Sequence, residues 1–361
     1  MKKSLTHMVE QLIRPEIRAL SAYHVTDARG LVKLDAMENP YSWPEEIKQA
    51  WLEALRDAPL NRYPDPEARA TKERLRAAQG VPAEAGLLLG NGSDELIQML
   101  ALALAQPERV ILAPEPGFVM YRLIALWCGM TYVGVPLRGD FTLDLDAMIE
   151  ATQRHQPALT FIAYPNNPTG NLFDEHAVRR IIEQSPGLVV LDEAYHAFAG
   201  ASFMQDVLRH PNLLVMRTLS KLGLAGLRLG LLAGDVRWLE QINKTRLPYN
   251  INVLTQLSVE FALQYGEIMQ RQAGLICAGR ERLFAELEKL PGVTAYPSRA
   301  NFILFRTAEG RANGLFDALK RSGVLVKNLH GAHPLLDDCL RVTVGTAEEN
   351  RIFIAALRKA L

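Results

Sequence analysis

Hydrophobic residues between about residues 85 and 235 occur in short runs that alternate with segments of helical period. The runs span 86–90, 109–113, 131–135, 159–164, 187–192, 213–218 and 227–234. Between them, segments such as 93–105 and 174–184 place apolar residues three or four positions apart, as a helix with one buried face does. Strands that are apolar throughout and alternate with helices are typical of a mostly parallel sheet sandwiched by helices.

The pattern changes after about residue 250. A long helical region covers 253–288, and short strands follow at 301–306, 323–327 and 339–344, with helices at 312–321 and 347–360. This order predicts a smaller α+β domain. We expect an N-terminal arm and part of the small domain in residues 1–40, a large domain in 41–250 and the small domain in 251–361.

Length and charge narrow the class of protein. The chain has 361 residues, which suits two domains, and its 40 Lys and Arg residues balance 40 Asp and Glu residues. No basic stripe with interleaved aromatic residues is present, so we expect no nucleic-acid partner. The N-terminus has no apolar region of the kind that signal peptides need, and the longest apolar run, near 99–105, is too short to cross a membrane.

The cysteines indicate a reducing compartment. Cys128, Cys277 and Cys339 are far apart and have neither CxxC nor metal-ligand spacing. We therefore expect no disulfide framework, no metal site and a cytoplasmic location.

Polar residues follow the predicted strands of the large domain at the points where these strands end. Ser93 and Asp94 follow 86–90, Asn167 follows 159–164, Asp192 ends 187–192, and Ser220 with Lys221 follows 213–218. In open α/β sheets, ligands bind in the crevice beyond the carboxyl ends of the strands. The sequence therefore predicts one binding site at this edge of the sheet.

An anion site is expected where the segment LGNGSDEL (89–96) turns from strand to helix. Two glycines allow a close approach, and the free backbone N–H groups of a helix N-terminus favour a phosphate. The alternative is a helix cap with acidic residues in its first turn. Ser220 and Arg228 would complete the phosphate shell, and we expect Arg228 in a buried strand because Leu227 and Leu229 flank it.

Lys221 and Asp192 suit the chemistry of a carbonyl cofactor. A buried lysine next to another cation has a lowered pKa and forms Schiff bases with carbonyls, including pyridoxal phosphate. Asp192, at the end of a buried strand, would be costly without a cation, and a protonated pyridine nitrogen would supply one. The alternative for Asp192 is a cap on a neighbouring helix.

Three further residues would complete such a site. Asn167 in YPNNPTG and Tyr195 in DEAY could donate to the phenolic oxygen of the ring, and Phe118 in PEPGF could cover its face. Asn167 and Phe118 have simpler explanations, since NNPTG could be only a turn and a lone Phe is more often part of a core.

The motifs GNGSDE, PEPGF, YPNNPTG, DEAY, SKLGLAGLRLG and CLRVTVGT occur in the order found in fold type I pyridoxal-phosphate enzymes, the aspartate-aminotransferase type, which the chain resembles. More closely, it resembles histidinol-phosphate aminotransferases over nearly its whole length, including LDAMENPY (34–41), NRYPDP (61–66) and LRVTVGT (340–346).

This resemblance implies roles for the cofactor residues. Lys221 would form the Schiff base with pyridoxal 5'-phosphate, and Asp192 would pair with the pyridine nitrogen. Asn167 and Tyr195 would contact the phenolic oxygen, and Phe118 would stack on the ring. The cofactor phosphate would be bound by the backbone amides of Ser93 and Asp94 and by the side chains of Ser220 and Arg228. Lys221, Asp192 and Tyr195 would be the catalytic residues.

The resemblance also implies how substrates bind. Arg341 would hold the acidic group of each substrate, Asn167 would also bind substrate, and Tyr23 and Tyr63 would contact the substrate phosphate. Tyr63 matches a residue that reaches the neighbouring subunit's site, which implies a homodimer. Lys327 stands where many relatives have a second substrate-binding arginine, and lysine offers a point charge in place of a bidentate fork.

The expected activity is the interconversion of histidinol phosphate and 2-oxoglutarate with imidazole-acetol phosphate and glutamate, in L-histidine biosynthesis. Two alternatives use the same cofactor site: an aromatic or broad-range amino-acid aminotransferase and a threonine-phosphate decarboxylase. A third is a ligand-sensing module of a transcription regulator, against which only about 30 residues precede LVKLDAMENP.

Overall fold

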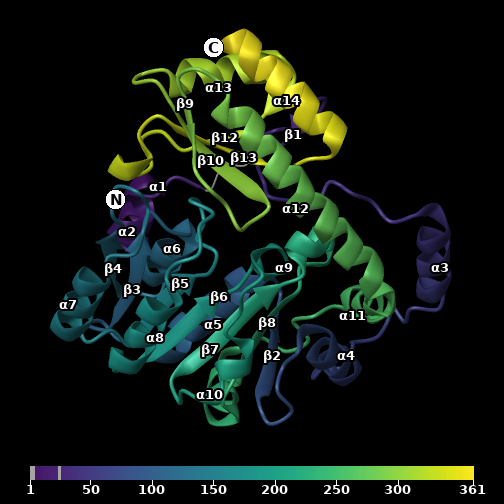
Figure 1. Cartoon of the computed structure of the whole chain (residues 1–361). Coiled ribbons are helices and arrows are strands. Elements are labelled where there is room, and N and C mark those ends of the chain that lie inside the picture. The colour runs from purple at the N-terminus through teal and green to yellow at the C-terminus, as the bar shows by residue number, and fades with distance from the viewer. Residues whose placement is uncertain (1–4, 23–25) are drawn as a thin grey trace.

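The predicted strands of the large domain form a seven-stranded sheet in the computed structural model, which describes residues 5–22 and 26–361 (Figure 1). The order is β2-β8-β7-β6-β5-β3-β4, and neighbours are parallel except where β8 pairs antiparallel with β2 and β7. The mostly parallel sheet is thus confirmed. Its strands are β2 (Gly86–Gly90), β3 (Val110–Glu115), β4 (Thr131–Pro136), β5 (Leu159–Ala163), β6 (Leu188–Asp192), β7 (Leu213–Thr218) and β8 (Gly230–Gly234).

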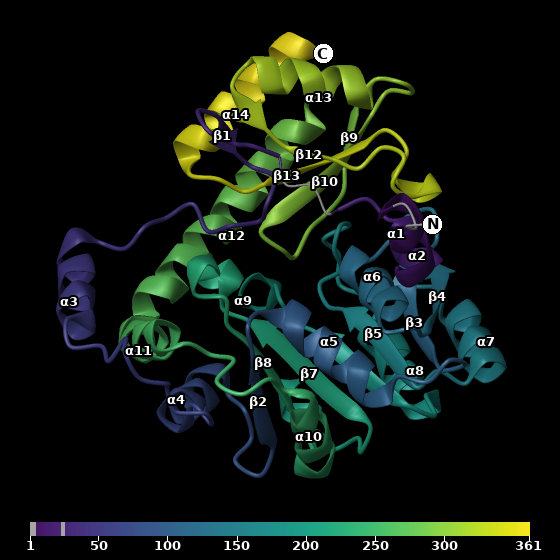
Figure 2. The ribbon, with the colours of Figure 1, turned by 180° about the vertical axis from the view of Figure 1, so that it is seen from behind.

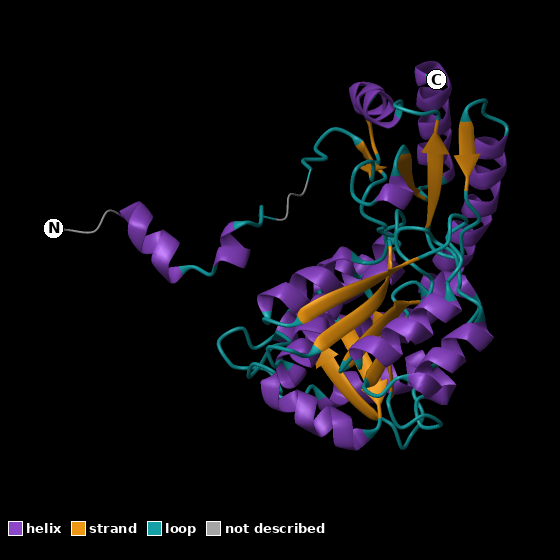
Figure 3. Ribbon diagram, turned by 90° about the vertical axis from the view of Figure 1, so that its left-hand side faces the viewer, coloured by secondary structure: helices purple, strands orange, loops and turns teal. Residues whose placement is uncertain are grey.

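Helices cover both faces of this sheet (Figures 2 and 3), which explains why its central strands are apolar throughout. Every residue of β5, β6 and β7 is buried. Along β6, Val189 and Leu191 pack on one face, and Leu188 and Val190 pack on the other. One face contacts α5 (Ser93–Leu104), α6 (Val119–Trp127) and α10 (Val236–Ile242), and the other contacts α4 (Arg69–Gln79), α7 (Leu145–His155) and α8 (Glu175–Gln184).

A second, antiparallel sheet lies above the first in Figure 1, in the order β12-β13-β10-β9. Phe302, Phe305 and Phe353 are at the centre of its core. β1 (Val32–Lys33) pairs with β11 (Val324–Leu325) beside it, so residues from the N-terminal part of the chain join the small α+β unit. The other elements are β9 (Val293–Ala295), β10 (Phe302–Thr307), β12 (Lys327–Asn328), β13 (Cys339–Thr343), α13 (Ala312–Arg321) and α14 (Ala347–Ala360).

Long helices connect the two units. α12 (Gly266–Glu288) runs from the large sheet to the small one, and α11 (Val253–Ala262) packs against α3 (Glu45–Leu55) and α4. Val259 and Ala262 of α11 belong to the core of the large sheet. The domain limits at residues 40 and 250 stay a prediction.

The N-terminal helices α1 (Leu5–Leu12) and α2 (Pro15–Arg18) extend away from both sheets in Figure 3. Arg14, between them, donates from Nη2 to the carbonyl of Trp127 at 2.6 Å. No helix within residues 5–22 and 26–361 combines the length and the apolar character needed to cross a membrane.

The predicted start of the strand at 227–234 was wrong. β8 begins at Gly230, and Arg228 lies in the left-handed region, at φ 51°, where it ends the 3-10 turn η3 (Ala225–Leu227). That conformation is far from the extended dihedral angles of a strand, and Arg228 lies outside the sheet with its side chain 49% exposed. The single strand expected at 323–327 is likewise divided between β11 and β12.

Candidate active site

A cavity of about 120 Å³ lies at the edge of the large sheet where the parallel strands end. β8 runs antiparallel, so its first residue, Gly230, pairs with the last residues of β2 and β7, Gly90 and Thr218. This reversal brings Arg228 to the same edge. All nine residues predicted to bind the cofactor line the cavity: Ser93, Asp94, Phe118, Asn167, Asp192, Tyr195, Ser220, Lys221 and Arg228.

Lys221 enters the cavity from the 3-10 turn η2 (Ser220–Leu222), which follows β7. Its Nζ lies 3.5 Å from the carbonyl oxygen of Ala36 and 5.7 Å from the centre of the Tyr195 ring. Burial, and then the charge of Arg341, lower the pKa of this amine from 10.5 to about 8. Near neutral pH a useful fraction of the amine is therefore uncharged and nucleophilic.

Asp192 ends β6 with its carboxylate buried. The backbone N–H of Ala194 donates to its Oδ1 at 3.1 Å, and the hydroxyl of Tyr121 donates to its Oδ2 at 2.7 Å. Burial raises the pKa of Asp192 to about 6, although the hydrogen bond from Tyr121 opposes this rise. The carboxylate thus has two neutral donors and is in a position to gain from a cation.

Tyr121 is a site residue that the sequence analysis missed. Its buried ring stacks on Phe161, with centroids 4.5 Å apart, and meets Phe118 edge to face at 5.4 Å. The signal was its position three residues after Phe118 at the start of a helix, since residues at that spacing share one face. Phe118, the predicted ring-stacking residue, is the N-cap residue of α6, and Tyr121 within α6 donates to Asp192, the predicted partner of the ring nitrogen.

The end of the cavity that suits an anion is formed by the N-terminus of α5. Gly92 is the N-cap residue and has no side chain with which to cap the first N–H groups, so the cap-only alternative does not describe Ser93. A Cβ on Gly230 would lie 2.8 Å from the backbone nitrogen of Ser93, so only glycine lets β8 approach this turn. Arg228 Nη2 lies 3.8 Å from Asp94 Oδ2.

Thr218, also missed from sequence, orients Ser220. Its hydroxyl donates to Ser220 Oγ at 2.9 Å and accepts from the backbone N–H of Ser220 at 3.1 Å. A hydroxyl at the last position of β7 thus fixes the side chain that precedes Lys221.

A second cavity of about 210 Å³ adjoins the first, and Met37, Phe118 and Asn167 line both. It contains Lys327 and Arg341, the predicted substrate-binding cations. Arg341 is 6% exposed and donates to Asn167 Oδ1 at 2.6 Å and to the carbonyl of Asp35 at 3.0 Å. The predicted substrate-binding cations Lys327 and Arg341 therefore lie next to the first cavity, which the predicted cofactor-binding residues line.

The segment Asp35–Met37 passes between the two cavities. The carbonyl of Asp35 accepts from Arg341, and the carbonyl of Ala36 accepts from Lys221. The Tyr195 hydroxyl lies 3.7 Å from the Sδ of Met37. Met37 has a φ of 54°, a strained conformation that persists because Thr343 Oγ1 accepts from its N–H and Asn301 Nδ2 donates to its carbonyl. No sequence pattern marked Met37, because its strain arises from contacts distant in sequence.

Tyr63 lies away from both cavities and is 79% exposed. Its ring stacks on Tyr249, with centroids 4.3 Å apart. Tyr23, the other residue predicted to contact the substrate phosphate, lies outside the described residues.

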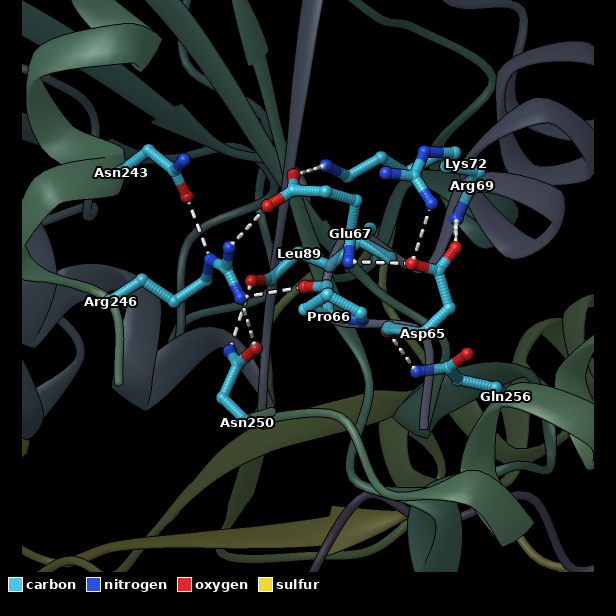
Figure 4. A network of polar contacts seen from close by, with 10 residues as sticks. All are labelled: Asp65, Pro66, Glu67, Arg69, Lys72, Leu89, Asn243, Arg246, Asn250 and Gln256. Atoms are coloured by element: carbon cyan, nitrogen blue, oxygen red, sulfur yellow. Dashed lines mark hydrogen bonds and ion pairs between the residues drawn. The ribbon is translucent and has the colours of Figure 1, made fainter. Parts of the chain in front are cut away.

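The loop that carries Tyr63 is held by the polar network in Figure 4. Arg246 donates to the carbonyl of Pro66 and pairs with Glu67, both at 2.9 Å. Asn250 donates to Leu89 of β2 and, at 2.7 Å, to Glu95 of α5. The exposed loop is thereby attached to the strand and helix that form the anion end of the cofactor cavity.

Comparison with known proteins identifies the family. The sequence pattern described as aminotransferase class I and II matches residues 29–357. The chain belongs to this family. The resemblance found from the motifs is confirmed.

Individual relatives cover almost the whole chain. It is 58% identical over 350 residues to histidinol-phosphate aminotransferase 2 of Nitrosococcus oceani, covering 97% of each chain. It is 52% identical to the histidinol-phosphate aminotransferase of Chromobacterium violaceum, covering 97% of this chain and 98% of that one. The crystal structure of the Sinorhizobium meliloti histidinol-phosphate aminotransferase with pyridoxal-5'-phosphate superposes with a TM-score of 0.86 at 22% identity, covering 97% of each chain, which confirms the fold.

The first cavity fits pyridoxal phosphate by its own chemistry. An amine with a lowered pKa, a buried carboxylate without a cationic hydrogen-bond donor and an uncapped helix N-terminus with a nearby guanidinium lie around one space. These groups match an aldehyde, a pyridinium and a phosphate, respectively. Asp94 Oδ1 is also buried without a hydrogen-bond partner among the described residues. The roles of the individual residues stay a prediction.

We predict that Tyr121→Phe raises the midpoint pH of cofactor binding, at which affinity has fallen by half, by about one pH unit. The variant keeps the ring on Phe161 but loses the hydrogen bond that lowers the pKa of Asp192. Asp94 and Lys221, the other charged groups acting on Asp192, are unchanged. Below its pKa the protonated carboxyl no longer pairs with a cation, so affinity weakens as pH falls through about 6 in the parent protein and at higher pH in the variant.

Titrating the cofactor-free protein with pyridoxal phosphate at a series of pH values measures this shift. Tyr265→Phe is the matched control, because it removes a hydroxyl from a ring that packs on Phe261 and lines neither cavity. An unchanged midpoint in Tyr121→Phe would show that the hydroxyl only fills space.

Proposed function

We propose that the protein is a pyridoxal-phosphate-dependent histidinol-phosphate transaminase. It interconverts histidinol phosphate and 2-oxoglutarate with imidazole-acetol phosphate and glutamate, a step of L-histidine biosynthesis. The observation that carries the proposal is the convergence of Lys221, Asp192 and an anion-binding helix end on one cavity, directly beside a second cavity that contains Arg341. Relatives of that name, 58% and 52% identical over nearly the full chain, support the choice of substrate.

Four polar residues of the first cavity, Asp192, Tyr195, Asn167 and Lys221, act on the cofactor ring or on the substrate proton in this proposal. When bound, pyridoxal phosphate withdraws the electron pair that remains on the substrate α-carbon after its proton leaves. Asp192 keeps the proton on the pyridine nitrogen, and Tyr195 donates to the phenolic oxygen. Asn167 does the same through its NH₂ group, because its carbonyl oxygen already accepts from Arg341.

Lys221 moves the proton. The free amine of Lys221 would remove the α-proton of the bound substrate as a general base and would return a proton as a general acid. Its pKa of about 8 suits both directions, because the charged and uncharged forms are both populated near neutral pH. Ping-pong kinetics follow, since one site handles donor and acceptor in turn.

The proposed functional unit is a homodimer in which Tyr63 reaches the partner's site. Tyr63, Leu60 and Leu247 are more than two-thirds exposed in one chain, and Tyr63 stacks on Tyr249. Exposed apolar side chains of this kind mark interaction surfaces. The cytoplasmic location stays a prediction from the cysteine usage.

The choice of amino donor tests the proposed activity. We predict that the visible absorbance of the holoenzyme converts to the pyridoxamine form at lower concentrations of histidinol phosphate than of phenylalanine. A better response to phenylalanine would favour the aromatic or broad-range aminotransferase. Release of CO₂ from threonine phosphate without conversion by glutamate would favour the decarboxylase, and no response to any of them would exclude all three.

Complementation tests the shared site. Lys221→Ala removes the proton carrier, and Tyr63→Ala removes the residue proposed to serve the partner. We predict that each homodimer is nearly inactive and that a 1:1 mixture regains up to about a quarter of the parent activity, because about half of the dimers are then mixed and one of the two sites in each mixed dimer has both residues. Mass spectrometry of differently tagged chains confirms mixing, and confirmed mixed dimers without activity would contradict a shared site.

A further inference from the structure

The second cavity carries an excess of positive charge. Arg122, Lys327 and Arg341 line it, and Glu115 is its single acidic residue among those described. Glu115 already accepts a hydrogen bond from Tyr132. The cavity therefore has a capacity for negative charge that its own carboxylate does not meet.

Two of these cations are held next to each other by strand register. Lys327 of β12 and Arg341 of β13 are directly paired across the small sheet. Side chains at such paired positions point to the same face of a sheet, and like charges there are destabilising. An anion between the two side chains removes this cost, so the register itself indicates an anion site.

Arg122 reaches the same cavity from the large domain. It follows Tyr121 on α6, and successive residues of a helix point about 100° apart. Tyr121 consequently faces Asp192 while Arg122 lines the second cavity. Its side chain is exposed and, among the described residues, pairs with no carboxylate.

We propose that Arg122 binds the phosphate of the phosphorylated substrate and sets the preference for a phosphate monoester over a carboxylate. The inference rests on the proposed function and adds to it the residue that distinguishes its two substrates. A phosphate monoester carries a charge of about −1.5 to −2 at pH 7, whereas a side-chain carboxylate carries −1. Lys327 supplies one point charge, but only a guanidinium supplies two parallel donors to phosphate oxygens.

The two amino donors therefore use the cavity differently. The glutamate carboxylate is satisfied by Arg341, which is buried and fixed by Asn167 and Asp35. The phosphate, with its greater charge, also engages Arg122 at the cavity wall. Loss of Arg122 thus weakens binding of the phosphorylated substrate and leaves binding of glutamate unchanged.

Steady-state kinetics of the Arg122→Met holoenzyme test this assignment. We expect KM for histidinol phosphate to rise about tenfold with kcat within about twofold, while KM for glutamate stays unchanged. We expect inhibition by inorganic phosphate to weaken to a similar degree, and Arg122→Lys to lie between the parent and Arg122→Met.

Arg74→Met is the matched control. Arg74 is another exposed arginine, on α4, that lines neither cavity, so the variant loses the same charge without touching the site. Equal KM increases for both substrates in Arg122→Met would indicate a general field effect and overturn the proposal, as would unchanged values.

Inorganic phosphate separates the two claims. If the parent enzyme does not use histidinol phosphate, the proposed function fails, but phosphate inhibition of the reaction with glutamate still reports on the anion site. Weaker inhibition in Arg122→Met than in the parent would then support Arg122 as the phosphate ligand. Equal inhibition would overturn it.

Discussion

A carboxylate buried at the end of an apolar strand is the constraint around which the site is arranged. Burial raises the pKa of Asp192 to about 6, and its partners are the neutral donors Tyr121 and Ala194. The next residue, Glu193, is also buried, but it pairs with Arg217 at 2.8 Å and accepts from Ser202. The two carboxylates have different partners, so Glu193 is neutralised inside the protein while Asp192 remains available for a cationic ligand.

Most of the fold could be predicted because the strands are apolar throughout. β2 and β7 have the bounds expected from sequence, since an unbroken buried run ends where polar residues begin. The prediction failed at Arg228, where two flanking leucines suggested a strand. The turn that forms there depends on a left-handed backbone and on Gly230 fitting against Ser93, and neither is visible in a pattern of apolar residues.

The candidate site could be predicted to the extent that it is made of strand ends. Residues such as Asn167 and Ser220 lie in the loops that follow β5 and β7, so alignment of the sheet brings them together. Tyr121, Thr218 and Met37 were missed because they act through other residues or through a strained backbone. Tyr63 is a different case, since its predicted partner would be a second chain and one chain leaves it on the surface.

Chemical trapping of the cofactor tests the central claim most directly. Reduction of the holoenzyme with borohydride converts a Schiff base between pyridoxal phosphate and a lysine into a stable bond, and peptide mass spectrometry then locates the modified lysine. The account predicts modification of Lys221 alone, and its loss in Lys221→Ala. Modification of a different lysine, or of none in a protein saturated with pyridoxal phosphate, would contradict it.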